Sequence, residues 1–157
     1  MNKKLVVYFS ATGRTERTAK SVAETLDADL CAIRPRKPYE NRDLNFMDSK
    51  ARSTLEMNNA ASRPEIEEIT ARIKEYDTVI IGFPVWWYTA PRIINTFIES
   101  TDLKGKDIFL FATSGGSTVE KAQQDLKKSY PELNIIGAKT LNGIYDPGEI
   151  SSWIQKR

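Results

Sequence analysis

A short run of hydroxyl-bearing and glycine residues follows the first apolar stretch of the sequence and leads into a helical pattern. The run consists of Ser10, Ala11, Thr12, Gly13, Arg14 and Thr15. The first turn of a helix leaves backbone N–H groups unpaired and carries the positive end of the helix dipole, so it attracts anions. Glycine permits a close approach, and hydroxyl groups add donors. These residues predict a phosphate site; a hydroxyl-rich helix start without a ligand is the alternative.

Three adjacent aromatic residues, bracketed by prolines, follow a later apolar stretch. The segment Pro84, Val85, Trp86, Trp87 and Tyr88 comes where a buried strand is expected to end. Side chains of a strand alternate between its two faces, so these rings cannot all point into the core. At least one is expected to face outward, where stacking on a flat ligand is worth about 1–3 kcal/mol. Aromatic residues are also favoured at interfaces, so a homodimer contact is the alternative.

A third segment, with Ser114, Gly115, Gly116 and Ser117, follows another expected strand. Two adjacent glycines let the main chain pass close to a ligand and direct its amides at acceptors, although a simple turn would explain them equally well. Together the three segments describe one ligand, which has a phosphate at the first segment and a flat polar ring between the other two.

The composition excludes several kinds of chemistry. The sequence has no histidine, which excludes Ser-His-Asp and Cys-His catalysis and imidazole-ligated metals. Cys31 is the only cysteine, so no internal disulfide can form, and this residue is expected to be buried. A net charge of +2 does not indicate nucleic-acid binding. The apolar runs are too short for membrane insertion, and a cytoplasmic location is expected.

The elements around these segments must hold them in place. Apolar runs of strand length alternate with helical patterns, which is typical of βαβ units and a parallel sheet. Right-handed crossovers place helices on both faces of such a doubly wound sheet, and ligands bind beyond the carboxyl ends of its strands. All three segments lie at such ends. Strands are expected at residues 4–9, 29–34, 77–83, 107–112 and 134–139, and helices at 14–27, 64–75, 91–99, 118–128 and from Asp146-Pro147 onward, with Asp146 as N-cap.

One connection is unusually long. Residues 35–63 separate the second expected strand from the next expected helix, and loops of this length are often functional. A helical turn or two is expected around Met47 to Met57.

The three segments resemble those of the flavodoxin family, and the resemblance extends over essentially the whole sequence. Residues 10–15 resemble the family's FMN phosphate loop, S/T-x-T-G-x-T, and residues 84–88 and 114–117 stand where the family places loops against the flavin ring. The W-W-x-x-A-P pattern of short bacterial members is matched by Trp86, Trp87, Ala90 and Pro91.

The resemblance implies one domain over residues 1–157, built on a three-layer, doubly wound, five-stranded parallel sheet with the strand order 2-1-3-4-5. It implies FMN as cofactor, with the phosphate held by residues 10–15 and the ring stacked on Trp86 or Trp87. Amides of residues 114–117 would meet the pyrimidine edge, and Tyr145 would lie at the rim.

The sequence departs from the family in two respects. Arg14 stands where the family often has Asn; it is expected to project into solvent, and a charge close to the phosphate is the alternative. Members that shuttle electrons at low potential are usually strongly acidic, whereas this chain has a pI of about 8.6.

Three functions remain open. The first is electron transfer to a redox partner protein. The second is an NAD(P)H-dependent reductase of quinones or other small molecules, with residues 35–63 covering the flavin. Tyr39, Arg52 and Glu56 would then be able to contact a substrate, although surface roles are expected for them. The third is a flavin-free protein-interaction domain.

Overall fold

The computed structural model describes residues 3–114, 117–141 and 147–155. Five strands form one sheet in which every neighbouring pair is parallel, with the order β2-β1-β3-β4-β5. This confirms the predicted fold class and strand order. The strands are β1 (Lys4–Tyr8), β2 (Asp29–Ala32), β3 (Thr78–Pro84), β4 (Asp107–Thr113) and β5 (Asn134–Thr140). The central strands β3 and β4 are mainly apolar and are buried over almost their whole length, because both of their faces are covered.

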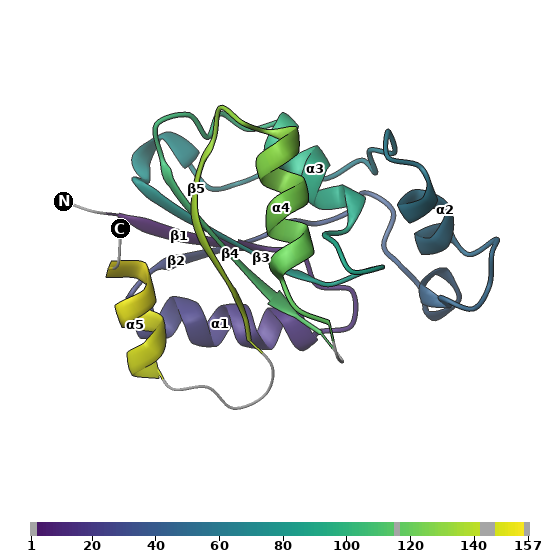
Figure 1. Cartoon of the computed structure of the whole chain (residues 1–157), viewed down its shortest axis with the longest axis horizontal. Helices are drawn as coiled ribbons and strands as arrows, with labels where there is room; N and C mark the ends of the chain where they lie inside the picture. Colours follow the sequence, from purple (N-terminus) through teal and green to yellow (C-terminus); the bar gives the residue numbers. More distant parts are fainter. Residues whose placement is uncertain (1–2, 115–116, 142–146, 156–157) are drawn as a thin grey trace.

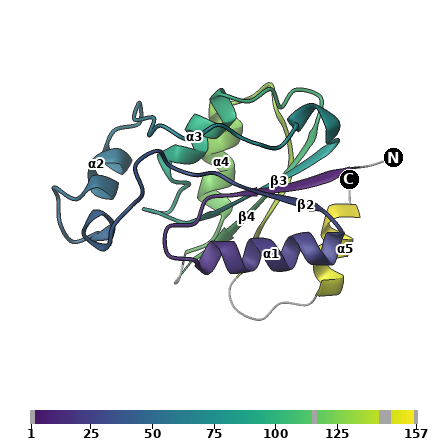
Figure 2. The ribbon, with the colours of Figure 1, turned by 180° about the vertical axis from the view of Figure 1, so that it is seen from behind.

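The helices form a layer on each face of the sheet. Those longer than one turn are α1 (Arg14–Leu26), α2 (Arg52–Asn58), α3 (Arg92–Glu99), α4 (Glu120–Ser129) and α5 (Pro147–Gln155). Figures 1 and 2 show α1 and α5 on one face, and α3 and α4 on the other. The amphipathic pattern of the helices in these two layers turns their apolar sides to the sheet, as Ile93, Ile94 and Phe97 of α3 do.

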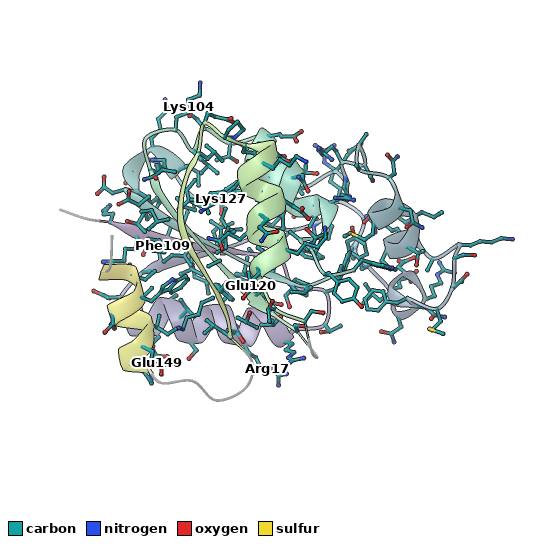
Figure 3. The ribbon with its side chains drawn as sticks, viewed as in Figure 1. Arg17, Lys104, Phe109, Glu120, Lys127 and Glu149 are labelled. Carbon is teal, nitrogen blue, oxygen red and sulfur yellow. The ribbon has the colours of Figure 1, made fainter. Side chains whose placement is uncertain are left out.

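Each face of the sheet has its own apolar core. On the face of α1 and α5, Phe109 of β4 packs edge-on against Trp153, with 5.2 Å between the ring centroids; Figure 3 labels Phe109. Phe111 lies in the same core beside Gly82 of β3. A Cβ atom at Gly82 would lie 2.1 Å from the nearest atom of the Phe111 ring, so this strand position requires glycine.

The predicted helix at residues 64–75 is wrong. The structure has extended chain there, with an antiparallel bridge between Pro35 and Ile66, and only a 3-10 turn, η2 (Ile73–Glu75), at its end. Backbone bonds from Arg36 N to Glu65 O and from Glu67 N to Arg34 O hold this chain against the segment after β2. Ile66, Ile69 and Ile73 recur at helical spacing, but tertiary pairing overrides that local preference.

Residues 35–63 form a lobe beyond the carboxyl ends of the strands. It contains the 3-10 turn η1 (Asn41–Leu44), which was not expected, and α2, which confirms the helical turns expected around Met47 to Met57. Helix α2 stands clear of the two helical layers in Figures 1 and 2. Among the residues that the structure describes, no helix is both long and apolar enough to span a bilayer.

Candidate functional site

One cavity brings the predicted segments together at the carboxyl ends of β1, β3 and β4. Its volume is about 270 Å³, and segments far apart in the chain contribute to its wall. The lining residues are Ala11, Thr12, Arg14, Thr15, Leu44, Phe46, Pro84, Val85, Trp86, Thr113 and Ser114. Figure 3 labels Arg17 and Glu120, which lie in the first turns of α1 and α4.

The loop before α1 has the geometry of a helix start that is open to an anion. Gly13 adopts a left-handed conformation with φ of 95°, and its amide donates to the Ser10 hydroxyl at 3.0 Å. A residue with a side chain would be strained at this φ, which explains the glycine. The first helical bond runs from Arg17 N to Gly13 O at 3.1 Å, so the amides of the first turn are not used within the helix.

Two side-chain contacts connect this loop to the end of β4. The hydroxyl groups of Thr15 and Thr113 lie 2.7 Å apart in a hydrogen bond that is buried. The guanidinium of Arg14 is exposed, but it donates to the carbonyl oxygen of Ser114 at 3.1 Å. Arg14 therefore joins two of the loops rather than simply projecting into solvent.

The aromatic loop is held in a strained tight turn. Trp86 and Thr89 exchange two backbone hydrogen bonds, of 2.9 and 3.0 Å, and the two residues between them have positive φ, 48° at Trp87 and 68° at Tyr88. This is the backbone of a type I′ turn, which normally carries Asn-Gly. Bulky side chains are costly in this conformation, and such strain is concentrated at functional sites.

The three aromatic side chains of the loop differ in their surroundings. Trp86 is 4% exposed and lines the cavity, whereas Tyr88 is 67% exposed. Trp87 is half-buried and meets Phe46 edge-on at 4.8 Å. This confirms that the three rings do not all point inward, and it gives Trp86 rather than Trp87 a place on the cavity wall.

The cavity is also lined by three residues that the sequence motifs did not indicate: Phe46, Leu44 and Thr113. Phe46 is 52% exposed and also lies edge-on to Trp86, with 6.2 Å between the ring centroids. Large apolar residues in the otherwise polar stretch of residues 40–50 were the signal that could have identified the first two.

The expected surface roles of Tyr39, Arg52 and Glu56 are wrong. The Tyr39 hydroxyl donates to Glu56 at 2.5 Å, and Arg52 pairs with the same carboxylate at 2.9 Å. The Arg52 and Glu56 side chains are only 18% and 11% exposed. Burial, and then the hydrogen bond to Glu56, raises the pKa of the Tyr39 hydroxyl, which keeps it protonated as a donor.

Other selected residues lie away from this wall or outside the described chain. Ser117 does not line the cavity, and its amide donates to the Ser114 hydroxyl at 2.7 Å. Gly115, Gly116, Tyr145 and Asp146 lie outside the described residues. Over the part of the chain that is described, no cluster of acidic or cysteine side chains is placed to hold a metal ion.

A second cavity, of about 430 Å³, opens on the other side of Ser10 and Ala11, between the ends of β1 and β2. It is larger, but Trp86 and the residues of β4 do not line it. The smaller cavity combines a helix start with the aromatic loop, so its wall is the one suited to a ligand with both a phosphate and a flat ring.

Comparison with known proteins identifies a family over nearly the whole chain. Residues 3–157 match the model of a family described as Flavodoxin. A protein of Bacteroides eggerthii DSM 20697, provisionally described as a flavoprotein, is 44% identical, with a TM-score of 0.95 over 99% of this chain and 97% of that one. A similar protein of Bacteroides uniformis ATCC 8492 is 46% identical, with a TM-score of 0.92 over 99% of both chains.

Two further proteins are more distant. A flavoprotein of Lactobacillus acidophilus NCFM, solved in complex with FMN, is 22% identical, with a TM-score of 0.77 over 98% of this chain and 99% of that one; it shares the fold. A stretch of 36 residues, 23% of this chain, is 33% identical to part of the uncharacterised NAD(P)H oxidoreductase YcaK of Escherichia coli (strain K12). That match spans only 18% of the E. coli protein.

Proposed function

Because this chain belongs to the flavodoxin family, we propose that it binds FMN non-covalently in the cavity at the start of α1 and uses the flavin to carry electrons. The observation that supports this most strongly is the shared wall, which joins three separate parts of the chain: Thr12 and Thr15 at the start of α1, Trp86 in the aromatic loop, and Ser114 after β4. The bound flavin supplies the redox chemistry, and the protein orients it and tunes it.

The residues around the helix start fit a phosphate. Gly13 turns the chain so that the first amides of α1 point out of the helix, and the Ser10 hydroxyl holds the Gly13 amide in place. Thr12 is exposed at the cavity and offers a hydroxyl donor. The bond between Thr15 and Thr113 fixes this loop to β4, so the donors are pre-positioned before a ligand arrives.

The aromatic side of the cavity fits a flat ring. Trp86 is buried against Phe9 and Tyr39, and Phe46 stands at the exposed edge of the same cavity. In this proposal Trp86 stacks on the flavin, Val85 to Tyr88 contribute backbone groups near its reactive edge, and Phe46 limits the access of water. Ser114 contributes from the β4 side.

FMN binding is tested directly on the purified protein. A yellow preparation that releases FMN on heating, and stripped protein that takes it up again, are the expected results. The double variant Ser10→Ala/Thr12→Ala is expected to bind FMN about ten-fold more weakly, because two hydrogen-bonding groups near the phosphate are lost. Ser21→Ala, on the exposed side of α1, is the matched control and should bind FMN as the wild type does. Stripped protein that takes up no FMN, even at high micromolar concentration, would contradict the proposal.

A second candidate is an NAD(P)H-dependent FMN reductase of quinones or other small molecules. The pI of about 8.6 and the short match to an NAD(P)H oxidoreductase favour it over a shuttle that docks through an acidic surface. Oxidation of NADPH by the holoprotein, with either a quinone or a redox partner protein added, separates the two. Steady turnover with quinone alone supports a reductase, whereas turnover only with the partner protein supports a carrier.

A further inference from the structure

Three side chains of the lobe form a connected unit, here named the Tyr39 brace, which consists of Tyr39, Arg52 and Glu56. The Tyr39 hydroxyl donates to one carboxylate oxygen of Glu56, and Arg52 Nε donates to the other at 2.9 Å. The guanidinium carbon of Arg52 lies 3.9 Å from the centroid of the Tyr39 ring. Arg52 and Glu56 stand one turn apart on α2, so a single short helix holds Tyr39 through both its hydroxyl and its ring.

The brace is itself anchored at both ends of α2. Arg52 Nη1 donates to the carbonyl oxygen of Lys37 at 2.6 Å, which fixes the chain that carries Tyr39. At the other end, Arg92 of α3 donates to the carbonyl oxygens of Glu56 and Met57, at 3.4 and 2.8 Å. The last carbonyls of a helix have no partner within it, so this arginine connects the lobe to the helical layer beneath it.

The brace contacts Trp86 through the ring of Tyr39. The Tyr39 ring meets Trp86 at 5.5 Å and 77°, and meets Phe9 of the core at 5.6 Å. Phe9 in turn meets Trp86 at 5.7 Å and 88°. Tyr39 therefore packs against both the core residue Phe9 and the indole, and the position of its ring limits the positions that the indole can take.

The charged pair of the brace, Arg52 and Glu56, is not explained by a contribution to the free energy of unfolding alone. Replacing such a largely buried ion pair with apolar side chains of similar volume is often neutral or stabilising, because the charges lose their hydration. The ion pair instead fixes the position of the Tyr39 side chain, since the Glu56 carboxylate accepts hydrogen bonds from both Tyr39 and Arg52 in a defined arrangement.

We propose that Tyr39, Arg52 and Glu56 are positioning residues that hold Trp86 where it meets the flavin ring, and that they thereby determine the affinity of the protein for FMN. The inference rests on the proposed function. When the indole is already held in place, FMN binding does not have to spend free energy on ordering it. When the indole can shift, it loses stacking contact with the flavin and binding is weaker.

The test uses two brace variants and one matched control. Arg52→Met/Glu56→Leu removes both charges together, so no unpaired charge remains buried, and Tyr39→Phe keeps the ring but removes its bond to Glu56. Arg36→Met/Glu65→Leu makes the same change at a pair whose side chains are 66% and 74% exposed and lie outside the cavity wall. For each protein, FMN affinity is measured by titration of stripped protein, and the free energy of unfolding is measured in urea without FMN.

The double brace variant is expected to bind FMN about ten-fold more weakly than the wild type, with an unfolding free energy that is unchanged or higher. Tyr39→Phe is expected to bind about five-fold more weakly, a smaller loss than in the double variant, because the ring stays in place and loses only its bond to Glu56. The near-ultraviolet circular dichroism of the stripped brace variants should also change as Trp86 loses its fixed setting, whereas the control should match the wild type in every measurement.

Two results would overturn the inference while leaving the proposed function intact. One is wild-type affinity for FMN in both brace variants; the other is weaker binding that only follows a loss of unfolding free energy. Wild-type protein that binds no FMN would instead overturn the proposed function, and the positioning role with it.

Discussion

At the scale of the residue, the most informative feature is the backbone of the aromatic loop. Trp87 and Tyr88 occupy the two central positions of a turn whose positive φ values normally call for Asn and Gly. Aromatic side chains kept at such positions imply that the loop serves something other than stability. The sequence indicated that these rings had a function, but it could not show the turn, because the local pattern does not contain the residues that such a turn prefers.

Tyr88→Gly is therefore expected to stabilise the protein without FMN by about 1 kcal/mol, since glycine adopts this φ without strain and little packing is lost at an exposed side chain. Urea unfolding of the stripped protein measures the change. Tyr88→Ala is the control, because it removes the ring but keeps a Cβ atom in the strained conformation. Equal stability of the two variants would show that the turn is not strained.

At the scale of the element, the strands and most helices followed from the sequence because their patterns agree with their tertiary surroundings. Continuous apolar runs predicted β3 and β4, which are covered on both faces. The helix predicted at residues 64–75 was wrong for the opposite reason. Its amphipathic pattern was overridden by pairing with the chain after β2, and the spacing of residues along the chain does not encode such a pairing.

The lobe was predicted only in part. Its length and position indicated a functional loop, and α2 lies where helical turns were expected. Phe46 and Leu44 were missed because contact across a cavity depends on where a long loop folds back. The Tyr39 brace was missed for a related reason, since charged and hydroxyl side chains in a polar stretch are usually exposed.

The packing of β3 beside β4 depends on the absence of a side chain at Gly82, where the Phe111 ring takes up the space. Gly82→Ala is expected to lower the free energy of unfolding by about 2 kcal/mol, because its Cβ atom would overlap the Phe111 ring. Phe111→Leu should recover part of that loss when it is combined with Gly82→Ala, with an interaction energy of about 1 kcal/mol in a double-mutant cycle measured by urea unfolding. Strictly additive effects would mean that the ring is not the obstacle.

At the scale of the whole molecule, one carboxylate connects the end of the lobe to both helices of the adjoining layer. Glu99 of α3 accepts from Arg63 at 3.0 Å, and from Tyr130, which follows α4. The hydrogen bonds from Arg63, and then from Tyr130, hold the pKa of Glu99 below its ordinary value of 4.5.

A lowered pKa in the folded state means that the unfolded chain binds this proton more readily. The stabilisation is therefore complete above pH 4.5 and is lost as the pH falls below that value toward the folded-state pKa. Urea unfolding between pH 6 and about pH 3 should show a smaller acid loss in Glu99→Gln than in the wild type. If the free energy of unfolding fell equally with pH in the two proteins, Glu99 would not contribute to the loss of stability in acid.

Cys31 lies on β2, at the open edge of the sheet, and its side chain is 7% exposed. As the sole thiol of the chain, it provides a built-in reporter of that edge. Because the side chain is almost completely covered, alkylating reagents reach the sulfur when the chain around it opens locally, so the rate of alkylation reports those openings. The stability of one margin of the molecule can thus be followed without introducing a probe.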